Sequence, residues 1–258
     1  LGRFASRLEV DVHVLSGQIT RLQNPVYAVK GLGLQVEDLI FAGRASARAA
    51  LSPEQCEQGA LLIDLGAGTT EYVVYHNRSL RHSRVIAVGG EHVSNDISVG
   101  LKLSNARAEK LKLEHGAAMP DPAAHGQTYN FTSDVGLDNR TVSISHLHQI
   151  VHARLEELLL LIRDDLAREG LLAHLRAGVV LTGGGARMSA MERLAAHVFQ
   201  MPAQTARATV GSGPSSILDE PECSTALGLV KLGAQQRDTG RHSRTGVLNW
   251  LAGKLVGS

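Results

Sequence analysis

Cysteine is scarce in this sequence. Its two cysteines, Cys56 and Cys223, lie far apart, and neither has a second cysteine or a paired histidine beside it. This spacing argues against a disulfide framework or a zinc site and suits a reducing compartment. The chain also has no run approaching the roughly 20 apolar residues that a membrane-spanning helix requires. Its 26 basic residues nearly balance its 25 acidic ones, so the composition does not favour nucleic acid as a partner.

The start of the sequence carries no secretory signal pattern, so we expect a cytoplasmic location. The first residue is Leu1 rather than methionine, and it leads directly towards a predicted strand, so we expect a sequence truncated at its N-terminus. Of the 258 residues, 43% are hydrophobic. A chain of this size and composition can bury a large core, which we expect to be divided between two lobes.

Hydrophobic periodicity predicts a mixture of strands and helices. The segments with alternating or continuous apolar residues, which we predict as strands, are 8–15, 36–41, 60–64, 72–75, 84–88, 142–144 and 179–182. The segments with a helical apolar pattern or many small residues, which we predict as helices, are 19–32, 42–51, 93–112, 145–168, 190–199 and 225–235. Residues 116–130 are predicted to be a loop. Gly33 is predicted to end the first helix, and Ser52-Pro53 the second.

A glycine turn follows the strand that ends at Asp64. The turn reads Gly66-Ala67-Gly68-Thr69-Thr70. Glycines allow the backbone to approach a ligand closely, and the amides and hydroxyls of such a hairpin can wrap a polyphosphate. The carboxylate of Asp64 could hold water bound to Mg²⁺. The alternative is an ordinary hairpin whose glycines serve only the turn.

A second glycine turn, Gly183-Gly184-Gly185, connects the apolar strand 179–182 to a helix. Such a turn offers backbone N–H groups and a surface free of side chains to a nucleotide. By itself it is a weak signal, because many α/β proteins have one and it lacks the P-loop pattern. Between the two turns, Glu109 and Lys112 lie on one helix face. They could bind ribose hydroxyls, and the alternative is a surface ion pair.

Taken in order, these motifs resemble the actin, sugar-kinase and DnaK superfamily, which has two phosphate hairpins, two connecting helices and an adenosine loop. Residues 63–71 match the second phosphate hairpin and 179–187 the adenosine loop, while 41–51 and 224–229 match the connecting helices. The resemblance implies an α/β, actin-like ATPase fold of the ribonuclease H-like kind, with two lobes around a nucleotide cleft. The loops around Asp64 and Gly184 are expected to converge on that cleft from opposite lobes.

The connecting helices are rich in small residues that would let them cross closely between the lobes. These residues are Ala45, Ala47, Ala226 and Gly228.

Within that superfamily the details resemble the FtsA family of bacterial cell-division proteins. The resemblance is carried by residues 81–97, by 108–116, and by the long helix 145–168 that precedes 177–184. The family's first phosphate hairpin, with its Asp-x-Gly motif, is absent, and so is most of its small inserted subdomain, of which residues 1–6 are the remnant. The resemblance therefore implies an incomplete first lobe, weak nucleotide binding and at most a weak ATPase.

The resemblance also implies ATP and Mg²⁺ as cofactors. Asp64 would position Mg²⁺ through water, and Glu109 and Lys112 would hold the ribose. The residues expected to cradle phosphate or to face the adenosine are Gly66, Ala67, Gly68, Thr69 and Thr70, and Gly183, Gly184 and Gly185. The residues that lie where the family receives the acidic C-terminal peptide of FtsZ are Arg140, His148 and Arg154.

The end of the chain resembles the family's membrane-targeting helix. Projected on a helix, Val247, Leu248, Leu251 and Leu255 share one arc, and Trp250 borders it. Aliphatic residues, an interfacial tryptophan and nearby cations suit an anionic membrane surface. The alternative is a helix that packs on the body of the protein.

The twelve histidines do not suggest a metal site. Only His148 and His152 share a helical face, and no acidic residue or cysteine completes a tetrahedral set nearby. We therefore expect no metal other than the Mg²⁺ that accompanies a nucleotide.

The predicted organisation has four parts. Residues 1–59 are expected to be the remainder of the first lobe, with the first connecting helix. Residues 60–235 are expected to be the second lobe, with an inserted subdomain at about 113–175. A flexible linker at 236–245 is expected to precede the amphipathic helix 246–258.

The predicted function is that of a cell-division scaffold. It would bind ATP, polymerise like actin and tether FtsZ filaments to the inner face of the cytoplasmic membrane, with no nucleic acid partner. A pilus-assembly adaptor of the PilM type shares the fold and stays an alternative. A DnaK-like or sugar-kinase-like ATPase is a third reading, which would require an intact first phosphate hairpin.

Overall fold

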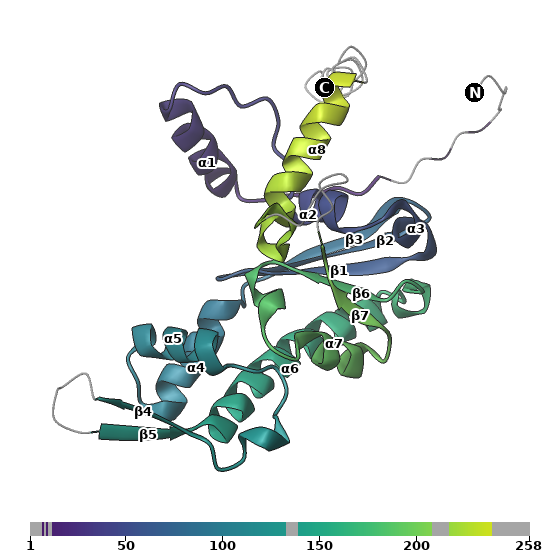
Figure 1. Cartoon of the computed structure of the whole chain (residues 1–258). Helices are drawn as coiled ribbons and strands as arrows, with labels where there is room; N and C mark the ends of the chain where they lie inside the picture. Colours follow the sequence, from purple (N-terminus) through teal and green to yellow (C-terminus); the bar gives the residue numbers. More distant parts are fainter. Residues whose placement is uncertain (1–6, 8, 10–11, 133–138, 208–216, 239–258) are drawn as a thin grey trace.

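The computed structural model describes residues 7, 9, 12–132, 139–207 and 217–238 (Figure 1). The helices are α1 (Ile19–Gly31), α2 (Ala42–Ala50), α3 (Pro53–Gln58), α4 (Gly90–Leu101), α5 (Asn105–His115), α6 (Ile144–Arg168), α7 (Met191–Phe199) and α8 (Ser224–Asp238). The strands are β1 (Ala60–Leu65), β2 (Thr70–His76), β3 (Ser79–Ile86), β4 (Thr128–Thr132), β5 (Asn139–Ser143), β6 (Val179–Thr182) and β7 (Ala203–Thr205). Within these ranges, no helix is long and apolar enough to cross a membrane.

The larger sheet has the strand order β3-β2-β1-β6-β7. The first three strands form an antiparallel meander, whereas β6 runs parallel to β1, and β7 runs parallel to β6. Parallel neighbours end at the same edge of a sheet. The loops that follow β1 and β6 therefore leave the sheet side by side.

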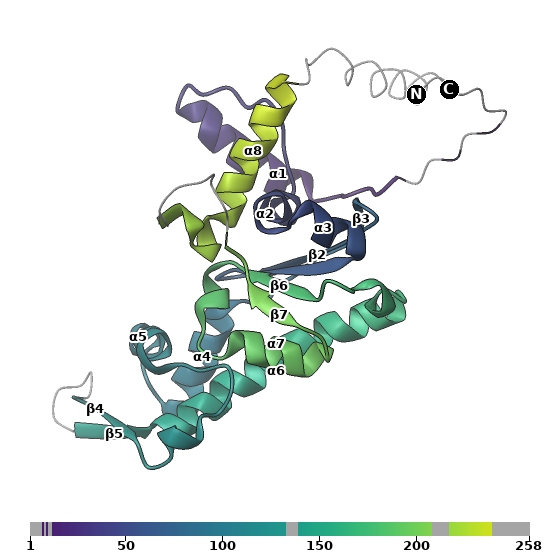
Figure 2. The same ribbon diagram turned by 45° about the vertical axis from the view of Figure 1, so that its right-hand side comes forward.

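Both faces of this sheet are covered by helices. Figure 2 shows α2, α3 and α8 on one side of the sheet and α6 and α7 on the other. In β1, Leu61 and Ile63 pack into the core on the α6 side, while Leu62 packs into the smaller core on the α2 side. Successive strand residues point to opposite faces. Burial of both faces therefore explains why β1 and β6 are continuous apolar runs.

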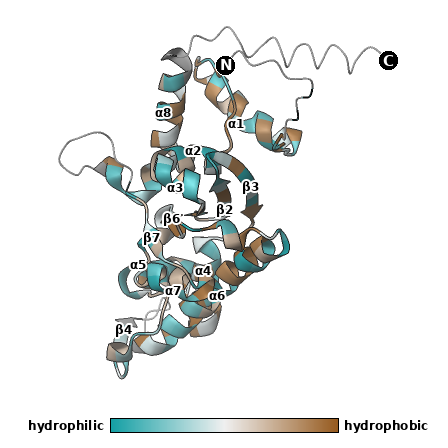
Figure 3. Ribbon diagram, turned by 90° about the vertical axis from the view of Figure 1, so that its right-hand side faces the viewer, coloured by the Kyte–Doolittle hydropathy of each residue, from teal (hydrophilic) through white to brown (hydrophobic). Residues whose placement is uncertain are grey.

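Helix α6 is the longest element and joins the sheet to a small β-hairpin. Its apolar stripe is fully or almost fully buried, with Leu147, Val151, Leu159 and Ile162 all at 0% exposure. The β4–β5 hairpin lies beyond α4 and α6, away from the main sheet (Figure 1). Helix α1 contrasts with α6, since none of its residues is buried, although it carries the hydrophobic residues visible in Figure 3.

Helices α2 and α8 cross at very short range, which confirms the expectation from their small residues. A Cβ atom placed on Gly228 would lie 1.8 Å from the carbonyl oxygen of Ala45. No side chain fits into that distance. Glycine at position 228 is therefore required by the crossing itself.

Several predicted elements are confirmed, and two predicted strands are wrong. Residues 36–41 form no strand, and neither do residues 12–15, the described part of the predicted strand 8–15. The side chains of Val12 and Val14 are 73% and 77% exposed. Apolar residues make a strand only where a partner strand is in reach, and in the described ranges neither segment pairs with a strand, although Phe41 packs against the smaller core on the α2 side.

The predicted helix 93–112 is two helices, α4 and α5. Lys102 adopts a left-handed conformation with φ of 54°, which ends α4. The sequence contained a signal for the missed helix α3. Ser52 and Gln55 form a capping box, with the Gln55 N–H 3.2 Å from Ser52 Oγ and the Ser52 N–H 2.8 Å from Gln55 Oε1. Pro53 therefore begins a helix, in the position that tolerates proline best.

The predicted linker and membrane helix fall largely outside the described residues. Helix α8 continues to Asp238, three residues into the expected linker. The tail residues that carry the membrane prediction all follow it, at Val247, Leu248, Trp250, Leu251 and Leu255.

Candidate functional site

The two glycine turns lie together at one end of the main sheet. Asp64 near the end of β1 pairs with Thr182 at the end of β6. The turns that follow them are thus neighbours, as predicted. The prediction that the two turns come from opposite lobes is wrong, because both follow adjacent strands of one sheet.

The second turn is shaped to pack against the first. Gly183 has a φ of +78°, and a Cβ atom there would lie 2.5 Å from Asp64 Oδ1 and 2.7 Å from the Leu65 carbonyl oxygen. A Cβ atom on Gly185 would lie 2.7 Å from the Cβ atom of Leu65. These two glycines are needed for the close approach of the turn to β1.

Gly68 and Gly184 differ from those two glycines. Apart from the adjoining backbone, no atom of the described residues lies within 4 Å of the position that a Cβ would take on either residue, and both residues are exposed. The packing of the described residues therefore does not require glycine at these positions. Glycine here leaves bare backbone at the surface, which suits the close approach of a ligand.

Two carbonyl groups of the first turn are hydrogen-bonded to the start of helix α4. The Gly66 N–H donates to the Thr69 carbonyl at 3.0 Å and closes the turn. The carbonyl oxygens of Gly66 and Ala67 accept the N–H groups of Gly90 and Glu91, at 3.0 and 2.8 Å. These two bonds satisfy donors at the start of α4 that have no partner within the helix. The exposed part of the turn is therefore Ala67 to Thr69.

Thr70 does not present its hydroxyl at the surface. Its side chain is fully buried, and Oγ1 donates to the Val88 carbonyl at 2.8 Å. Thr69 is exposed. Of the two hydroxyls expected to cradle phosphate, only that of Thr69 is therefore available to a ligand in this conformation.

The two oxygens of the Asp64 carboxylate have different neighbours. Its Oδ2 atom accepts a hydrogen bond from Ser46 Oγ of α2 at 2.7 Å, and Thr225 Oγ1 of α8 lies 3.3 Å away. Its Oδ1 atom faces Gly183. A carboxylate with one oxygen on the side of the turns can hold a hydrated divalent cation, so the residues present fit a Mg²⁺–nucleotide.

Lys112 lies inside the protein, not at its surface. Its ammonium group is within 3.0 Å of the Gly90 carbonyl, 2.9 Å of Ser94 Oγ and 2.7 Å of Glu109 Oε2. All three of its donors are used, so the expectation that it binds ribose directly is wrong for this conformation. Glu109 keeps 44% of its side chain exposed. Burial opposes its ionisation, but the bonds from Lys112 and Ser94 outweigh burial and lower the pKa of Glu109.

Of the predicted partner residues, His148 is not at the surface. His148 is buried, with its Nε2 atom 2.9 Å from the His115 carbonyl, so it is not a surface contact. Arg154 is paired with Asp96 at 2.5 and 3.1 Å. Arg140 lies in β5. The spacing along α6 was the missed signal, because His148 lies four residues after the buried Ile144 and three before the buried Val151, on the same face of the helix.

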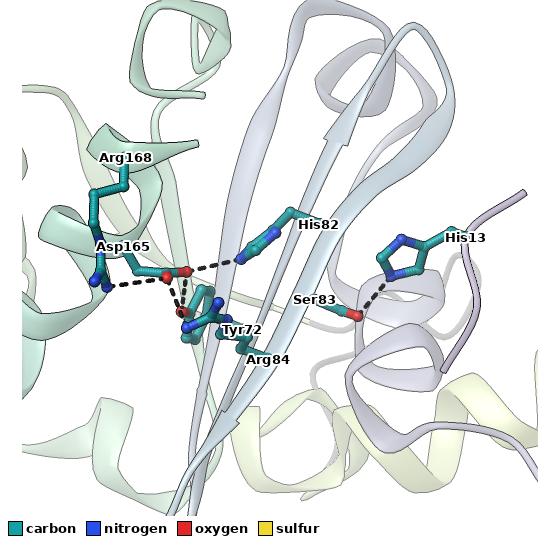
Figure 4. Close-up of polar contacts among 7 residues, drawn as sticks. All are labelled: His13, Tyr72, His82, Ser83, Arg84, Asp165 and Arg168. Atoms are coloured by element: carbon teal, nitrogen blue, oxygen red, sulfur yellow. Dashed lines mark hydrogen bonds and ion pairs between the residues drawn. The ribbon is translucent and has the colours of Figure 1, made fainter. Parts of the chain in front are cut away.

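A buried polar network that the sequence did not reveal is centred on Asp165 of α6 (Figure 4). Its Oδ2 atom accepts bonds from Tyr72 at 2.6 Å and His82 at 2.8 Å, and its Oδ1 atom lies 2.8 Å from Arg84 and 3.4 Å from Arg168. Burial opposes ionisation, but these donors lower the pKa of Asp165. Burial, together with the bond to Asp165, raises the pKa of Tyr72. The network fastens α6 to β2 and β3.

Other candidate sites are less developed. Within the described ranges, no group of three or more histidine, cysteine, aspartate or glutamate side chains is placed to hold a metal ion. One groove is lined by Pro25, Val26, Val29, residues 35–40, Leu229 and Gly233. A second, more polar groove is lined by residues 48–53, Gln55, Glu192, residues 204–207 and Lys231.

Comparison with solved structures identifies the fold. The structure of MreB5 of Spiroplasma citri bound to ADP matches with a TM-score of 0.69 at 18% sequence identity, over 87% of this chain and 68% of that one. A chain of a PilM–PilN type IV pilus biogenesis complex matches with a TM-score of 0.58 at 18% identity, over 82% of this chain and 57% of that one. At such identities the likeness shows the actin-like fold alone.

Comparison of sequences is more specific. The family model for cell division protein FtsA matches residues 61–228. The FtsA of Pseudomonas aeruginosa is 33% identical over 240 residues, and that of Escherichia coli K12 is 31% identical over 247 residues; each alignment covers 93% of this chain. The chain spans 58% and 59% of the lengths of these relatives. With an actin-like fold and this family match across both glycine turns, the chain belongs to the FtsA family of cell-division proteins.

Proposed function

We propose that this chain is a cell-division scaffold that binds a magnesium–nucleotide at its two glycine turns. The observation that supports this proposal is the pairing of β1 with β6, which brings Asp64 beside Gly183. The bare backbone at Gly68 and Gly184 is the second support. Ligands of open α/β sheets bind outside the carboxyl ends of the parallel strands, where these turns lie.

Each part of the site has a proposed task. The amides of Ala67 to Thr69 and the Thr69 hydroxyl receive phosphate, and the flat surface at Gly184 receives the adenosine. Asp64 would hold the hydrated metal ion with its carboxylate. Mg²⁺, when bound, would neutralise phosphate charge and orient the phosphate oxygens. Glu109 meets the ribose with its exposed part, and Lys112 fixes Glu109 in place.

We also propose three interactions of the scaffold: with copies of itself, with the membrane and with FtsZ filaments. Copies of the chain associate into filaments, the C-terminal segment 246–258 lies on the membrane surface, and the scaffold connects FtsZ filaments to it. This proposal rests on membership of the FtsA family and on the amphipathic pattern of the tail. His148 has no part in it, because its side chain is buried.

Nucleotide binding is tested with Gly184→Val. Position 184 has open space around it, so a valine there should leave the thermal midpoint unchanged while its side chain covers the surface needed by the adenosine. We expect affinity for a fluorescent ATP analogue with Mg²⁺ to fall by about tenfold or more, equivalent to about 1.4 kcal/mol. Gly31→Val is the matched control. Gly31 also has open space around it, and it lies in α1, distant in sequence from the two glycine turns.

Equal affinity of the Gly184→Val variant and the unchanged chain would reject the site. A fall in affinity with Gly31→Val as well would show a general effect of adding a valine.

Membrane binding is tested by flotation with vesicles that contain anionic lipid. The chain that retains residues 246–258 should float with the vesicles, and the chain without them should stay at the bottom of the gradient. Binding should weaken as salt is raised, because cations near the tail contribute about 1 kcal/mol each at the membrane surface. Equal flotation of the two chains would refute the tether.

A further inference from the structure

The helices that cross above the sheet both reach the Asp64 carboxylate. Ser46 of α2 is fully buried and donates its hydroxyl proton to Asp64 Oδ2 at 2.7 Å. Thr225 of α8 lies 2.7 Å from Ser46 Oγ and 3.3 Å from the same carboxylate oxygen. The Ser46 proton is already used, so Thr225 is the donor in the contact between the two hydroxyls. The three side chains therefore form a clasp, defined here as Ser46, Asp64 and Thr225.

The clasp is held rigidly by the backbone around it. Ser46 directly follows Ala45, whose carbonyl oxygen would lie 1.8 Å from a Cβ atom on Gly228. Gly228 is three residues after Thr225, about one turn along α8. The two hydroxyls are thus fixed by the closest point of the helix crossing, and neither helix can shift there without changing its distance to Asp64.

A second carboxylate anchors the same helix. Glu71 is the β2 partner of Asp64, and its Oε2 atom accepts the Gly43 N–H at 2.8 Å. This bond satisfies a donor in the first turn of α2, where negative charge is favoured. Burial raises the pKa of Glu71, the Gly43 N–H opposes that rise, and the charge of Asp64 adds to it. Helix α2 is therefore tied to the sheet at Gly43 and at Ser46, three residues apart.

The clasp leaves the other oxygen of Asp64 on the side of the turns. Gly183 lies against Oδ1, and a Cβ atom there would be 2.5 Å from it. A free aspartate side chain samples several rotamers. The Ser46 hydroxyl on Oδ2, itself held by Thr225, selects the rotamer in which Oδ1 faces the second turn.

We propose that Ser46 and Thr225 are positioning residues that hold Asp64 towards the glycine turns and couple the turns to the crossing of α2 and α8. This inference rests on the proposed nucleotide site. Coupling between two sites is reciprocal. A ligand that uses Asp64 therefore tightens the helix crossing, and loosening the crossing weakens that ligand.

The test compares nucleotide affinity with Mg²⁺ and with a chelator, in the full chain. Ser46→Ala should weaken binding of a fluorescent ATP analogue about tenfold with Mg²⁺, since a hydrogen bond to a charged group is removed. Thr225→Val, which keeps the volume but removes the second hydroxyl, should have a smaller effect, about threefold. Binding in the chelator should change by less than about twofold, because only the metal-dependent part uses Asp64.

Ser98→Ala is the control for a merely structural effect. The Ser98 hydroxyl donates to the Leu103 carbonyl at 2.7 Å at the end of α4, away from the clasp. This variant should lower stability without changing affinity with or without Mg²⁺. If Ser46→Ala lowers both affinities equally, or lowers neither, the coupling between clasp and turns is overturned.

A second measurement separates this inference from the proposed function. If the unchanged chain binds no nucleotide under either condition, the proposed function fails. The clasp is then judged by a double-mutant cycle of Ser46→Ala and Asp64→Ala on the unfolding equilibrium of the ligand-free chain, since alanine at position 64 leaves no acceptor for the Ser46 hydroxyl. A coupling of about fivefold or more supports the clasp, and additive effects overturn it.

Discussion

Two aspartates of this protein differ in how their oxygens are used. Asp165 has donors on both oxygens, namely Tyr72, His82, Arg84 and Arg168. Asp64 has a donor from α2, Ser46, on Oδ2, with Thr225 of α8 bonded to Ser46, while its Oδ1 atom faces the second glycine turn. A carboxylate with both oxygens satisfied is suited to hold elements together. A carboxylate with one oxygen directed at a pair of bare turns is suited to meet a ligand.

The positions of the two aspartates fit this distinction. Asp165 is a buried residue of α6 that faces the β2–β3 hairpin, within the body of the fold (Figure 4). Asp64 lies near the end of β1, beside the loops that follow two parallel strands. The same chemical group thus serves stability in one place and is proposed to serve binding in the other.

The largest effect is expected from Asp165→Asn. We expect the free energy of unfolding to fall by about 2–3 kcal/mol, because Tyr72 and His82 lose a charged acceptor in the interior. Arg84 and Arg168 contribute less, since their side chains are 52% and 73% exposed and water can solvate them. Urea denaturation measures the change. Asp164→Asn, at an exposed neighbouring position, should have almost no effect.

A smaller loss of stability is expected from Asp64→Asn, about 1 kcal/mol or less. The amide oxygen of asparagine can still accept the Ser46 hydroxyl, and no cation depends on this carboxylate in the ligand-free chain. The same urea experiment makes the comparison. A loss as large as that of Asp165→Asn would show that Asp64 is a structural carboxylate of the same kind.

The smallest expected effect is on the pH dependence of the unfolding free energy. The pKa of Asp165 is lowered in the folded chain, so its contribution is present above the ordinary carboxyl pKa of about 4 and is lost as pH falls through the folded value. Unfolding free energy should therefore decline on acidification below about pH 4. The decline should be shallower in Asp165→Asn than in the unchanged chain. Parallel curves for the two chains would contradict the assigned pKa shift.

Much of the fold could be predicted because its signals are local. The apolar runs of β1 and β6, the apolar stripe of α6 and the small residues of α2 each follow from a pattern within one segment. The glycine turns could be located for the same reason. The capping box at Ser52 and Gln55 was also local, and its helix could have been predicted.

The missed features depend on residues that meet from distant parts of the chain. Tyr72 and His82 reach Asp165 across 93 and 83 positions, and no periodicity indicates such a meeting. Ser46 and Thr225 are 179 positions apart. The buried place of Lys112 follows from the way α5 packs on the start of α4. The failure of residues 36–41 to form a strand likewise depends on which strands are in reach.

The central claim is that the turns beside Asp64 form a metal-dependent nucleotide site. Its most direct test is a titration of the unchanged chain and of Asp64→Asn with a fluorescent ATP analogue, each with Mg²⁺ and with a chelator. The account predicts that Mg²⁺ strengthens binding by the unchanged chain and that Asp64→Asn removes about tenfold or more of that gain, with little change in the chelator. A gain from Mg²⁺ that is the same in both chains would contradict it.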